Sequence, residues 1–226
     1  MQQNTLKVAL PKGRLYDDVV SACLKTELLE RAEDVSKLSR KLVQQVSETG
    51  HIFLLAKPAD VPAYVEHGAA DIGFTGRDII AEEDRDLYEV LDLEVGSCDL
   101  VVAVPAEMGV DNLDELPDIV RVATSYPAVT QRFFQEKEIK AEIIELNGSV
   151  ELAPQVDLAD IIVDITSTGT TLRRNDLIPV AGVLSSSVRM VVNQTSYRTR
   201  RDLISRLCRQ MAPSGAEVGE WSKCSF

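Results

Sequence analysis

Histidine and cysteine are scarce in this chain of 226 residues, and each scarcity excludes a common kind of site. The cysteines form no C-x-x-C pair and show no regular spacing, so we expect reduced thiols rather than a disulfide scaffold. The two histidines, His51 and His67, are paired neither with each other nor with a cysteine. A structural zinc site is therefore not expected, and we predict both histidines at the surface. The four cysteines are Cys23, Cys98, Cys208 and Cys224.

Long hydrophobic runs are also missing. No apolar stretch approaches the ~20 residues that a membrane-spanning helix needs. The first eight residues lack the apolar core of a signal peptide. We therefore expect a cytoplasmic protein that does not interact with a membrane.

Positive charge is in short supply as well. The 24 Lys and Arg residues face 36 Asp and Glu, which gives a formal net charge of −12. A surface of this sign repels phosphate backbones, so binding to nucleic acid or to an anionic membrane is not expected. Any small anionic ligand must instead meet a local group of arginines and lysines, which makes neighbouring basic residues informative.

Short β-branched runs alternate with amphipathic stretches along the chain, a pattern typical of an α/β fold. The continuous apolar runs Leu100–Val104 and Ile161–Val163 predict strands covered on both faces, as in a parallel sheet. Asn112 is expected to cap a helical turn. The predicted strands are Lys7–Leu10, Ile52–Ala56, Asp71–Phe74, Leu100–Val104, Val120–Ala123, Glu142–Glu145, Asp160–Asp164 and Val188–Asn193. The predicted helices are Leu15–Leu24, Ala59–His67, Pro127–Lys137, Ser149–Gln155, Thr170–Asn175 and Thr199–Met211.

Two segments of the chain resemble each other. Val65–Gly76 and Val156–Ser167 both read as a helix, an Ala-Asp-Ile sequence, an apolar strand and a turn with threonine. The match is short and can also arise from generic α/β composition. If it is real, it implies two similar lobes whose strand-end loops face each other across a ligand cleft.

The strongest chemical pattern is the segment from Asp164 to Leu172. An apolar strand ends in a carboxylate, and small hydroxyl residues and a glycine then lead into a helix. Small residues let backbone N–H groups approach a phosphate, and the carboxylate can accept hydrogen bonds from sugar hydroxyls. The alternative is a capped turn in which Asp164 acts only locally. Neither G-x-x-x-x-G-K-[ST] nor G-x-G-x-x-G occurs, so a P-loop or a dinucleotide site is not indicated.

A second pattern, Lys12-Gly13-Arg14, follows the first predicted strand. Two cations beside a glycine can hold phosphate oxygens, although an ordinary exposed basic turn would look the same. Arg40, Lys41 and Lys57 could converge on the same cleft, or each could be a solvated surface charge.

Together these pieces resemble the ATP phosphoribosyltransferase family, and specifically its short catalytic form. The resemblance extends from Lys7 to about Ala212. The segments that carry it, in order, are Leu10–Arg14, Ser39–Leu42, Asp60–Gly73, Asn147–Pro154 and Asp164–Leu172.

The resemblance implies a reaction. Family members join N1 of the ATP adenine to C1 of phosphoribosyl pyrophosphate and release pyrophosphate, with Mg²⁺, in the first step of histidine biosynthesis. It implies that Glu151 lies near the ribose and the metal, and that Arg14 and Arg40 are the catalytic cations. Mg²⁺ would be held mainly by substrate oxygens, with Glu151 a possible ligand. ATP binding is assigned to Lys12, Gly13, Arg14, Arg40 and Lys57. Phosphoribosyl pyrophosphate binding is assigned to Glu151, Asp164, Thr166, Ser167, Thr168, Gly169, Thr170 and Thr171.

The resemblance also implies an architecture and a partner. We expect two α/β lobes resembling type II periplasmic binding proteins, with the active site in the cleft between the lobes. Lobe I would be residues 1–96 plus 180–213, lobe II residues 97–179, and residues 214–226 a mobile tail. Short forms assemble with a paralogue of histidyl-tRNA synthetase, which supplies histidine regulation, so we expect a dimer within a larger hetero-oligomer. A regulatory domain of the long form is not expected.

Two departures from the family limit the transfer of its site residues. Many relatives have an arginine at the position of Lys57, and the segment from Ser214 to Phe226 matches nothing in the family. Two alternatives remain open. One is a non-catalytic two-lobed sensor of small ligands, and the other is a phosphoribosyltransferase for another base.

Overall fold

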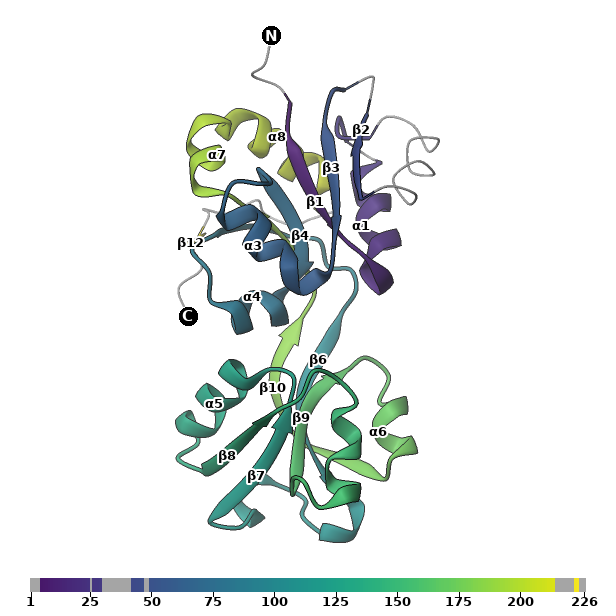
Figure 1. Cartoon of the computed structure of the whole chain (residues 1–226), viewed down its shortest axis with the longest axis vertical. Helices are drawn as coiled ribbons and strands as arrows, with labels where there is room; N and C mark the ends of the chain where they lie inside the picture. Colours follow the sequence, from purple (N-terminus) through teal and green to yellow (C-terminus); the bar gives the residue numbers. More distant parts are fainter. Residues whose placement is uncertain (1–4, 25, 30–41, 47–48, 214–221, 224–226) are drawn as a thin grey trace. The chain divides into compact units, whose positions relative to one another are not determined.

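The chain folds into two compact α/β units. The computed structural model describes residues 5–24, 26–29, 42–46, 49–213 and 222–223 (Figure 1). The first unit is formed within Met1–Gly96 and Ser187–Phe226, and the second is Ser97–Ser186. The expected second boundary, after residue 179, falls inside strand β10 (Leu177–Ser186), whose residues pair with β6 (Cys98–Pro105) up to Ser186.

The first unit is built on a seven-stranded sheet with the order β12-β5-β11-β4-β1-β3-β2. Strands β3, β1 and β4 are parallel, whereas β11 runs antiparallel to both β4 and β5. The strands are β1 (Lys7–Pro11), β2 (Val43–Gln45), β3 (Ile52–Ala56), β4 (Ile72–Gly76), β5 (Tyr88–Asp92), β11 (Val188–Val192) and β12 (Ser222–Lys223).

Helices cover both faces of this sheet. Val19 of α1 and Leu207 of α8 are fully buried in one apolar cluster with Phe53 and Phe74. Val65 of α3 and Ile80 of α4 are buried in a second cluster, with Ala9 of β1. The central strands are therefore shielded on both sides, which is why they are almost wholly apolar. The helical elements are η1 (Gly13–Leu15), α1 (Tyr16–Cys23), η2 (Pro58–Asp60), α3 (Val61–Glu66), α4 (Arg77–Glu83), α7 (Gln194–Thr199) and α8 (Arg201–Met211).

The second unit contains a five-stranded sheet with the order β10-β6-β9-β7-β8. Strands β9 (Ile161–Thr166), β7 (Ile119–Thr124) and β8 (Lys140–Glu145) are parallel, and β6 is antiparallel to both of its neighbours. Val150 and Leu172 cover one face of the sheet in a cluster with Ile162. The helical elements are η3 (Ala106–Met108), η4 (Leu113–Glu115), α5 (Pro127–Glu136), η5 (Val150–Leu152), η6 (Pro154–Val156) and α6 (Thr170–Arg174).

Most predicted elements are present, and four expectations need correction. The run Leu100–Val104 is buried on both faces as expected, but its strand is antiparallel, because burial of both faces does not depend on strand direction. Ser149–Gln155 forms two short 3-10 turns, η5 and η6, rather than one helix. Ser222–Lys223, in the expected mobile tail, pair with β5 as β12. Strands β2, β5 and β10 and helix α4 were not predicted, and neither was α7, which shares only Thr199 with the predicted helix Thr199–Met211. The expected cap is confirmed, because the Asn112 side chain accepts a hydrogen bond from Asp114 N–H at 3.0 Å.

His51 is buried, contrary to the prediction, with 4% of its surface exposed. Its Nδ1 accepts a hydrogen bond from Leu6 N–H at 3.0 Å, which satisfies a backbone donor just before β1. Burial lowers the pKa of His51, so the ring is neutral at pH 7. His67 is exposed, as expected. Cys23, Cys98 and Cys208 are buried and form no disulfide.

The two similar sequence segments are also similar in structure. Asp71 precedes β4 and donates its N–H to the Lys7 carbonyl, and its carboxylate accepts Lys7 N–H at 2.7 Å. Asp160 precedes β9 and makes the same pair of bonds with Arg121, its carboxylate accepting Arg121 N–H at 2.8 Å. In each unit an aspartate thus fixes the register of one parallel strand pair.

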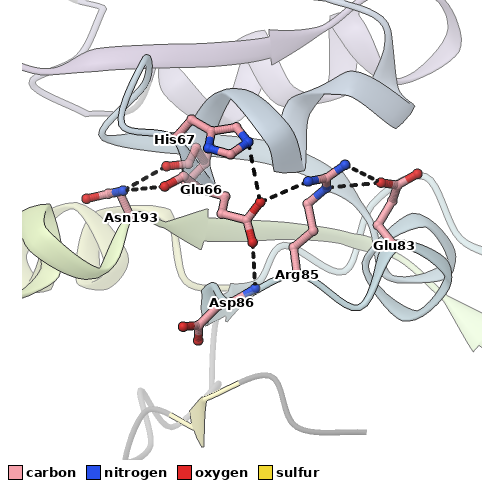
Figure 2. Close-up of polar contacts among 7 residues, drawn as sticks. Glu66, His67, Glu83, Arg85, Asp86 and Asn193 are labelled. Atoms are coloured by element: carbon pink, nitrogen blue, oxygen red, sulfur yellow. Dashed lines mark hydrogen bonds and ion pairs between the residues drawn. The ribbon is translucent and has the colours of Figure 1, made fainter.

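A polar network surrounds Glu66, the last residue of α3 (Figure 2). Arg85 lies between two carboxylates, 2.8 Å from Glu66 and 2.9 Å from Glu83. The hydrogen bond from Arg85 holds the pKa of Glu66 below its usual value. The Asn193 side chain donates to the carbonyls of Val65 and Glu66, which caps α3 from the end of β11. The network is structural and joins α3 to the connection between α4 and β5.

Among the helices in the described part of the chain, none is long and apolar enough to cross a membrane.

Candidate active-site residues

Basic residues gather at one edge of the first sheet. Pro11 and Ala56 are paired at the carboxyl ends of the neighbouring parallel strands β1 and β3, so Lys12 and Lys57 leave the sheet side by side. Lys12 N–H donates to the Ala56 carbonyl at 2.8 Å, which ties the two strand ends together. Both lysines are exposed.

The turn after Lys12 requires a glycine. Gly13 has φ of +78°, a conformation in which a side chain would be strained, and nothing lies within 4 Å of the position of a Cβ. The open space leaves the backbone accessible to a ligand. Arg14, exposed in the following turn η1, donates from Nη1 to the Gly96 carbonyl at 3.3 Å. Arg40 and Lys41 lie outside the described residues.

Arg77 is a further cation at this edge that the sequence reasoning missed. It follows β4, the other parallel neighbour of β1, and its N–H donates to the Ser187 carbonyl at 3.1 Å. The sequence contains a signal for it, because Gly76-Arg77 repeats the Gly-Arg pair of Gly13-Arg14 at the passage from a strand to a helical turn. It was overlooked because α4 was not predicted.

Asp164 lies near the carboxyl end of β9 in the second unit and is half-buried. Burial raises the pKa of its carboxyl group above the usual value, the hydrogen bond from Ile165 N–H opposes the rise, and the negative charge of Glu151 adds to it. The electrostatic effect of Glu151 on Asp164 indicates that the two carboxylates share one region. Two adjacent acidic groups suit ribose hydroxyls or a hydrated divalent cation.

The loop after β9 is ordered by its own hydroxyl groups. Thr166 Oγ1 accepts Gly169 N–H at 2.9 Å, and the hydroxyls of Thr168 and Thr170 are 2.9 Å apart. Ser167, Thr168, Thr170 and Thr171 are exposed, and the start of α6 has no side-chain cap. The loop therefore presents hydroxyl groups and an uncapped helical turn to solvent, which are groups that bind phosphate.

A pocket of about 630 Å³ lies within the second unit, at the C-terminal end of α6. Glu151 and Asn175 line it, and Asn175 Nδ2 also donates to the Thr171 carbonyl at 3.0 Å. Asn175 Oδ1 accepts from the Gln155 side chain at 3.0 Å, which joins α6 to η6. The residues assigned from sequence thus form two groups. Lys12, Gly13, Arg14 and Lys57 lie in the first unit, and Glu151, Asp164 and the segment 166–171 lie in the second.

Comparison with known proteins relates this chain to one enzyme family. A sequence model of the family described as ATP phosphoribosyltransferase matches residues 57–213. The ATP phosphoribosyltransferase of Halothermothrix orenii is 54% identical over 199 residues, 88% of this chain and 89% of that protein. The enzyme of Bacillus subtilis is 44% identical over 209 residues, 92% of this chain and 94% of that protein.

Solved structures agree with the sequence comparison. The ATP phosphoribosyl transferase (HisG:HisZ) complex from Thermotoga maritima contains a chain that is similar with a TM-score of 0.75 and 35% identity, covering 91% of this chain and 95% of that one. The alkanesulfonate-binding protein SsuA from Xanthomonas axonopodis has a TM-score of 0.57 at 11% identity, covering 93% of this chain and 73% of that one. The second likeness shows the fold alone and supports the predicted two-lobed, type II periplasmic-binding-protein architecture. By its sequence and by its fold, this chain belongs to the ATP phosphoribosyltransferase family.

Proposed function

We propose that the chain transfers the 5-phosphoribosyl group of phosphoribosyl pyrophosphate to N1 of ATP. In this proposal the residues of the second unit bind the phosphoribosyl group, and the cations of the first unit bind the polyphosphate groups. The observation that carries the proposal is the Asp164 region. A half-buried carboxylate, whose pKa is raised by burial and by the charge of Glu151, leads directly into an exposed hydroxyl loop, inside the segment that matches the family.

The loop is suited to the 5-phosphate and ribose of phosphoribosyl pyrophosphate. Hydroxyls of Thr166, Ser167, Thr168, Thr170 and Thr171 can donate to phosphate oxygens, and Gly169 stays in this site on the strength of the family resemblance. The Asp164 carboxylate accepts hydrogen bonds from the ribose hydroxyls. These contacts orient C1 for attack, and the fixed hydrogen-bond donors stabilise the phosphate charge.

The cations of the first unit are suited to the polyphosphate groups of both substrates. Lys12, Gly13, Arg14 and Lys57 share one sheet edge, and we add Arg77 to them. Arg40, which lies outside the described residues, stays in the proposal on the strength of the family resemblance. Grouped cations are needed here because the net charge of −12 repels polyphosphates elsewhere on the surface. We propose that the two units are the lobes of the enzyme and that each contributes its group of residues to catalysis.

The proposed chemistry requires charge stabilisation more than proton transfer. As the bond at C1 breaks, positive charge grows on the ribose and negative charge on the leaving pyrophosphate. Preorganised cations such as Arg14 lower the barrier by meeting that negative charge. Adenine N1 carries its own lone pair, so no strong general base is needed.

Mg²⁺ fits the donors that are present. Glu151 and Asp164 supply hard oxygen ligands, and no cluster of three His, Cys, Asp or Glu suited to holding a metal occurs in the described ranges. That donor set suits an ion held mainly by substrate phosphates and water, with Glu151 as the protein ligand. When bound, Mg²⁺ would neutralise charge on the leaving pyrophosphate.

A partner subunit is part of the proposal. The similar Thermotoga chain comes from a HisG:HisZ complex, and we propose that this chain also works with a regulatory subunit resembling histidyl-tRNA synthetase, in the cytoplasm, as a dimer within a hetero-oligomer. A histidine titration of activity with and without that subunit tests this assembly. Inhibition of equal strength in both samples would contradict it.

The decisive test of the reaction is mass spectrometry of the products formed from ATP, phosphoribosyl pyrophosphate and Mg²⁺. We expect phosphoribosyl-ATP and pyrophosphate in equal amounts, and neither product when one substrate or the metal is omitted. Replacing ATP by GTP or by free adenine tests the second enzymatic alternative. Binding of the substrates without any product would support the sensor alternative instead.

A further inference from the structure

Arg173 folds back from α6 onto the loop after β9. Its Nη2 donates to the Thr168 carbonyl at 2.8 Å and reaches Thr170 Oγ1 at 3.4 Å. Thr170 Oγ1 in turn lies 2.9 Å from Thr168 Oγ1. One guanidinium therefore contacts the backbone of the loop and one of its two linked hydroxyls.

The peptide between Thr168 and Gly169 is consequently held at both ends. Its carbonyl accepts from Arg173, and its N–H donates to Thr166 Oγ1 at 2.9 Å. With both polar groups engaged, this peptide cannot rotate without breaking two hydrogen bonds. The Thr166 hydroxyl keeps its proton for a ligand, because it acts here as the acceptor.

Gly169 makes room for this arrangement. A Cβ at Gly169 would lie 2.8 Å from Arg173 Nη1, closer than two such atoms can approach. The same residue has φ of +68°, which any side chain would strain. Gly169 is therefore needed twice, for its backbone conformation and for the space that the guanidinium occupies.

The positive charge of Arg173 is directed at the loop and not at a carboxylate. Within the described ranges, none of the ion pairs involves Arg173, and its guanidinium donates to a carbonyl and a hydroxyl. A carbonyl that pointed into a phosphate site would repel the anion. Arg173 binds the Thr168 carbonyl, which therefore points toward the guanidinium. The same guanidinium adds a positive charge beside the loop.

We propose that Arg173 is a positioning residue for phosphoribosyl pyrophosphate, which holds the Thr168–Gly169 peptide so that the loop has its phosphate-binding conformation before the substrate arrives. The inference rests on the proposed function of the loop. Preorganisation of this kind strengthens binding of the substrate whose phosphate meets the loop and leaves the other substrate unaffected.

The test compares Arg173→Met and Arg173→Lys with the wild-type chain, together with its partner subunit where activity requires it. The readouts are kcat, the KM values of both substrates, and the Kd of phosphoribosyl pyrophosphate with Mg²⁺ measured by calorimetry. For Arg173→Met we expect KM and Kd for phosphoribosyl pyrophosphate to rise about tenfold, the lower end for a hydrogen bond to a charged group, because the side chain is exposed. Arg173→Lys should recover part of the loss, since lysine keeps the charge but not the planar fork. KM for ATP should stay within about twofold.

Lys140→Met is the charge-matched control. Lys140 opens strand β8 and is paired with Ile119 at the amino end of the parallel strands, whereas the loop follows their carboxyl end. This variant removes one exposed positive charge from the same unit without touching the loop. Its substrate constants should equal those of the wild type.

A double-mutant cycle tests the link between Arg173 and Gly169. Gly169→Ala should weaken phosphoribosyl pyrophosphate binding by straining the backbone and displacing the guanidinium, so its effect should be smaller in the Arg173→Met background. Gly109→Ala controls for strain, because Gly109 has φ of +66° in the same unit and nothing near its Cβ position.

The outcomes separate this inference from the proposed function. A wild-type enzyme that neither binds nor consumes phosphoribosyl pyrophosphate would overturn both. A working wild-type enzyme with Arg173→Met constants within twofold of normal would overturn the positioning role alone. An equal rise in both KM values, or fully additive effects of Gly169→Ala and Arg173→Met, would also contradict it.

Discussion

Asp160 binds Arg121 through both its backbone and its side chain. The Asp160 N–H donates to the Arg121 carbonyl at 2.9 Å, its carboxylate accepts Arg121 N–H at 2.8 Å, and the carboxylate lies 2.6 Å from the guanidinium. The hydrogen bond from Arg121 lowers the pKa of Asp160. The two strands that these residues join, β7 and β9, position Asp164 and its loop.

The first prediction is that Asp160→Ala destabilises the chain by about 1 kcal/mol, chiefly through the lost backbone hydrogen bond. The ion pair adds little, because its guanidinium is exposed and screened by salt. Chemical denaturation at pH 7 measures the change. Asp118→Ala, an exposed aspartate of the same unit, should have no measurable effect. Because the folded pKa of Asp160 is lowered, its contribution to stability is present above about pH 4 and is lost as pH falls through the folded pKa. Equal losses in the two variants would contradict the assignment.

The second prediction concerns His51 and acid sensitivity. Its pKa is lowered in the folded state, so below about pH 6.5 the unfolded chain takes up a proton that the folded chain does not. Stability should therefore fall as pH decreases from 6.5 toward the folded pKa. His51→Leu should be less stable at pH 7, because Leu6 N–H loses its acceptor, and should show a flatter pH dependence.

Urea denaturation at pH 7.5 and pH 5.5 measures this difference. The exposed His67 supplies the matched control, and His67→Gln should keep the wild-type pH dependence. An unchanged slope in His51→Leu would show that other groups cause the acid sensitivity.

The third prediction separates stability from function at Asp164. Its pKa is raised in the folded state, so keeping the ionised carboxylate in the fold costs stability at pH 7. Asp164→Asn should have an equal or higher Tm, since an asparagine can still accept the Ile165 hydrogen bond. Its kcat/KM for phosphoribosyl pyrophosphate should drop, because the charged acceptor for the ribose hydroxyls is gone. Thermal denaturation and steady-state kinetics of the same sample test this pair of effects, and a lower Tm with normal kinetics would refute it.

The fourth prediction distinguishes the cations at the edge of the first sheet. Loss of one preorganised electrostatic contact commonly costs ~2.7 to 4 kcal/mol in the transition state, or roughly 10² to 10³ in rate. Arg14→Met should lose turnover on that scale. Arg77→Met should mainly raise the KM for a polyphosphate substrate, because we assign it to binding. Arg198→Met, an exposed arginine on α7, is the control. Normal kinetics of Arg14→Met at saturating substrates would show that Arg14 is an exposed charge without a catalytic role.

The pattern of apolar residues was sufficient to predict the central strands of both sheets. Strands such as β3 and β9 are nearly continuous apolar runs, because both faces of each sheet are covered, and Ile52–Ala56 was predicted with its bounds unchanged. The hydroxyl segment at 166–171 and the basic turn at 12–14 were visible because small or charged residues stand directly after such runs. The paired aspartates Asp71 and Asp160 were visible as a repeated Ala-Asp-Ile sequence.

The elements that sequence reasoning missed depend on partners distant in the chain. Strand β10 contains Pro179 and Gly182 and many partly exposed residues, and its extended form is fixed by pairing with β6 across two irregularities. The direction of β6 was misjudged because an apolar run reports burial and not the orientation of its neighbours.

By itself, the sequence determined the α/β class and the family, and it supplied the residues that we propose bind phosphate, because hydrophobic period and local residue chemistry are properties of neighbouring positions. Tertiary structure alone decided that His51 is buried under Leu6, that Arg77 joins Lys12 and Lys57 at one sheet edge, and that Arg173 turns back onto its loop. Those facts depend on strand order, register and side-chain direction, which arise only when segments far apart in the chain pack together.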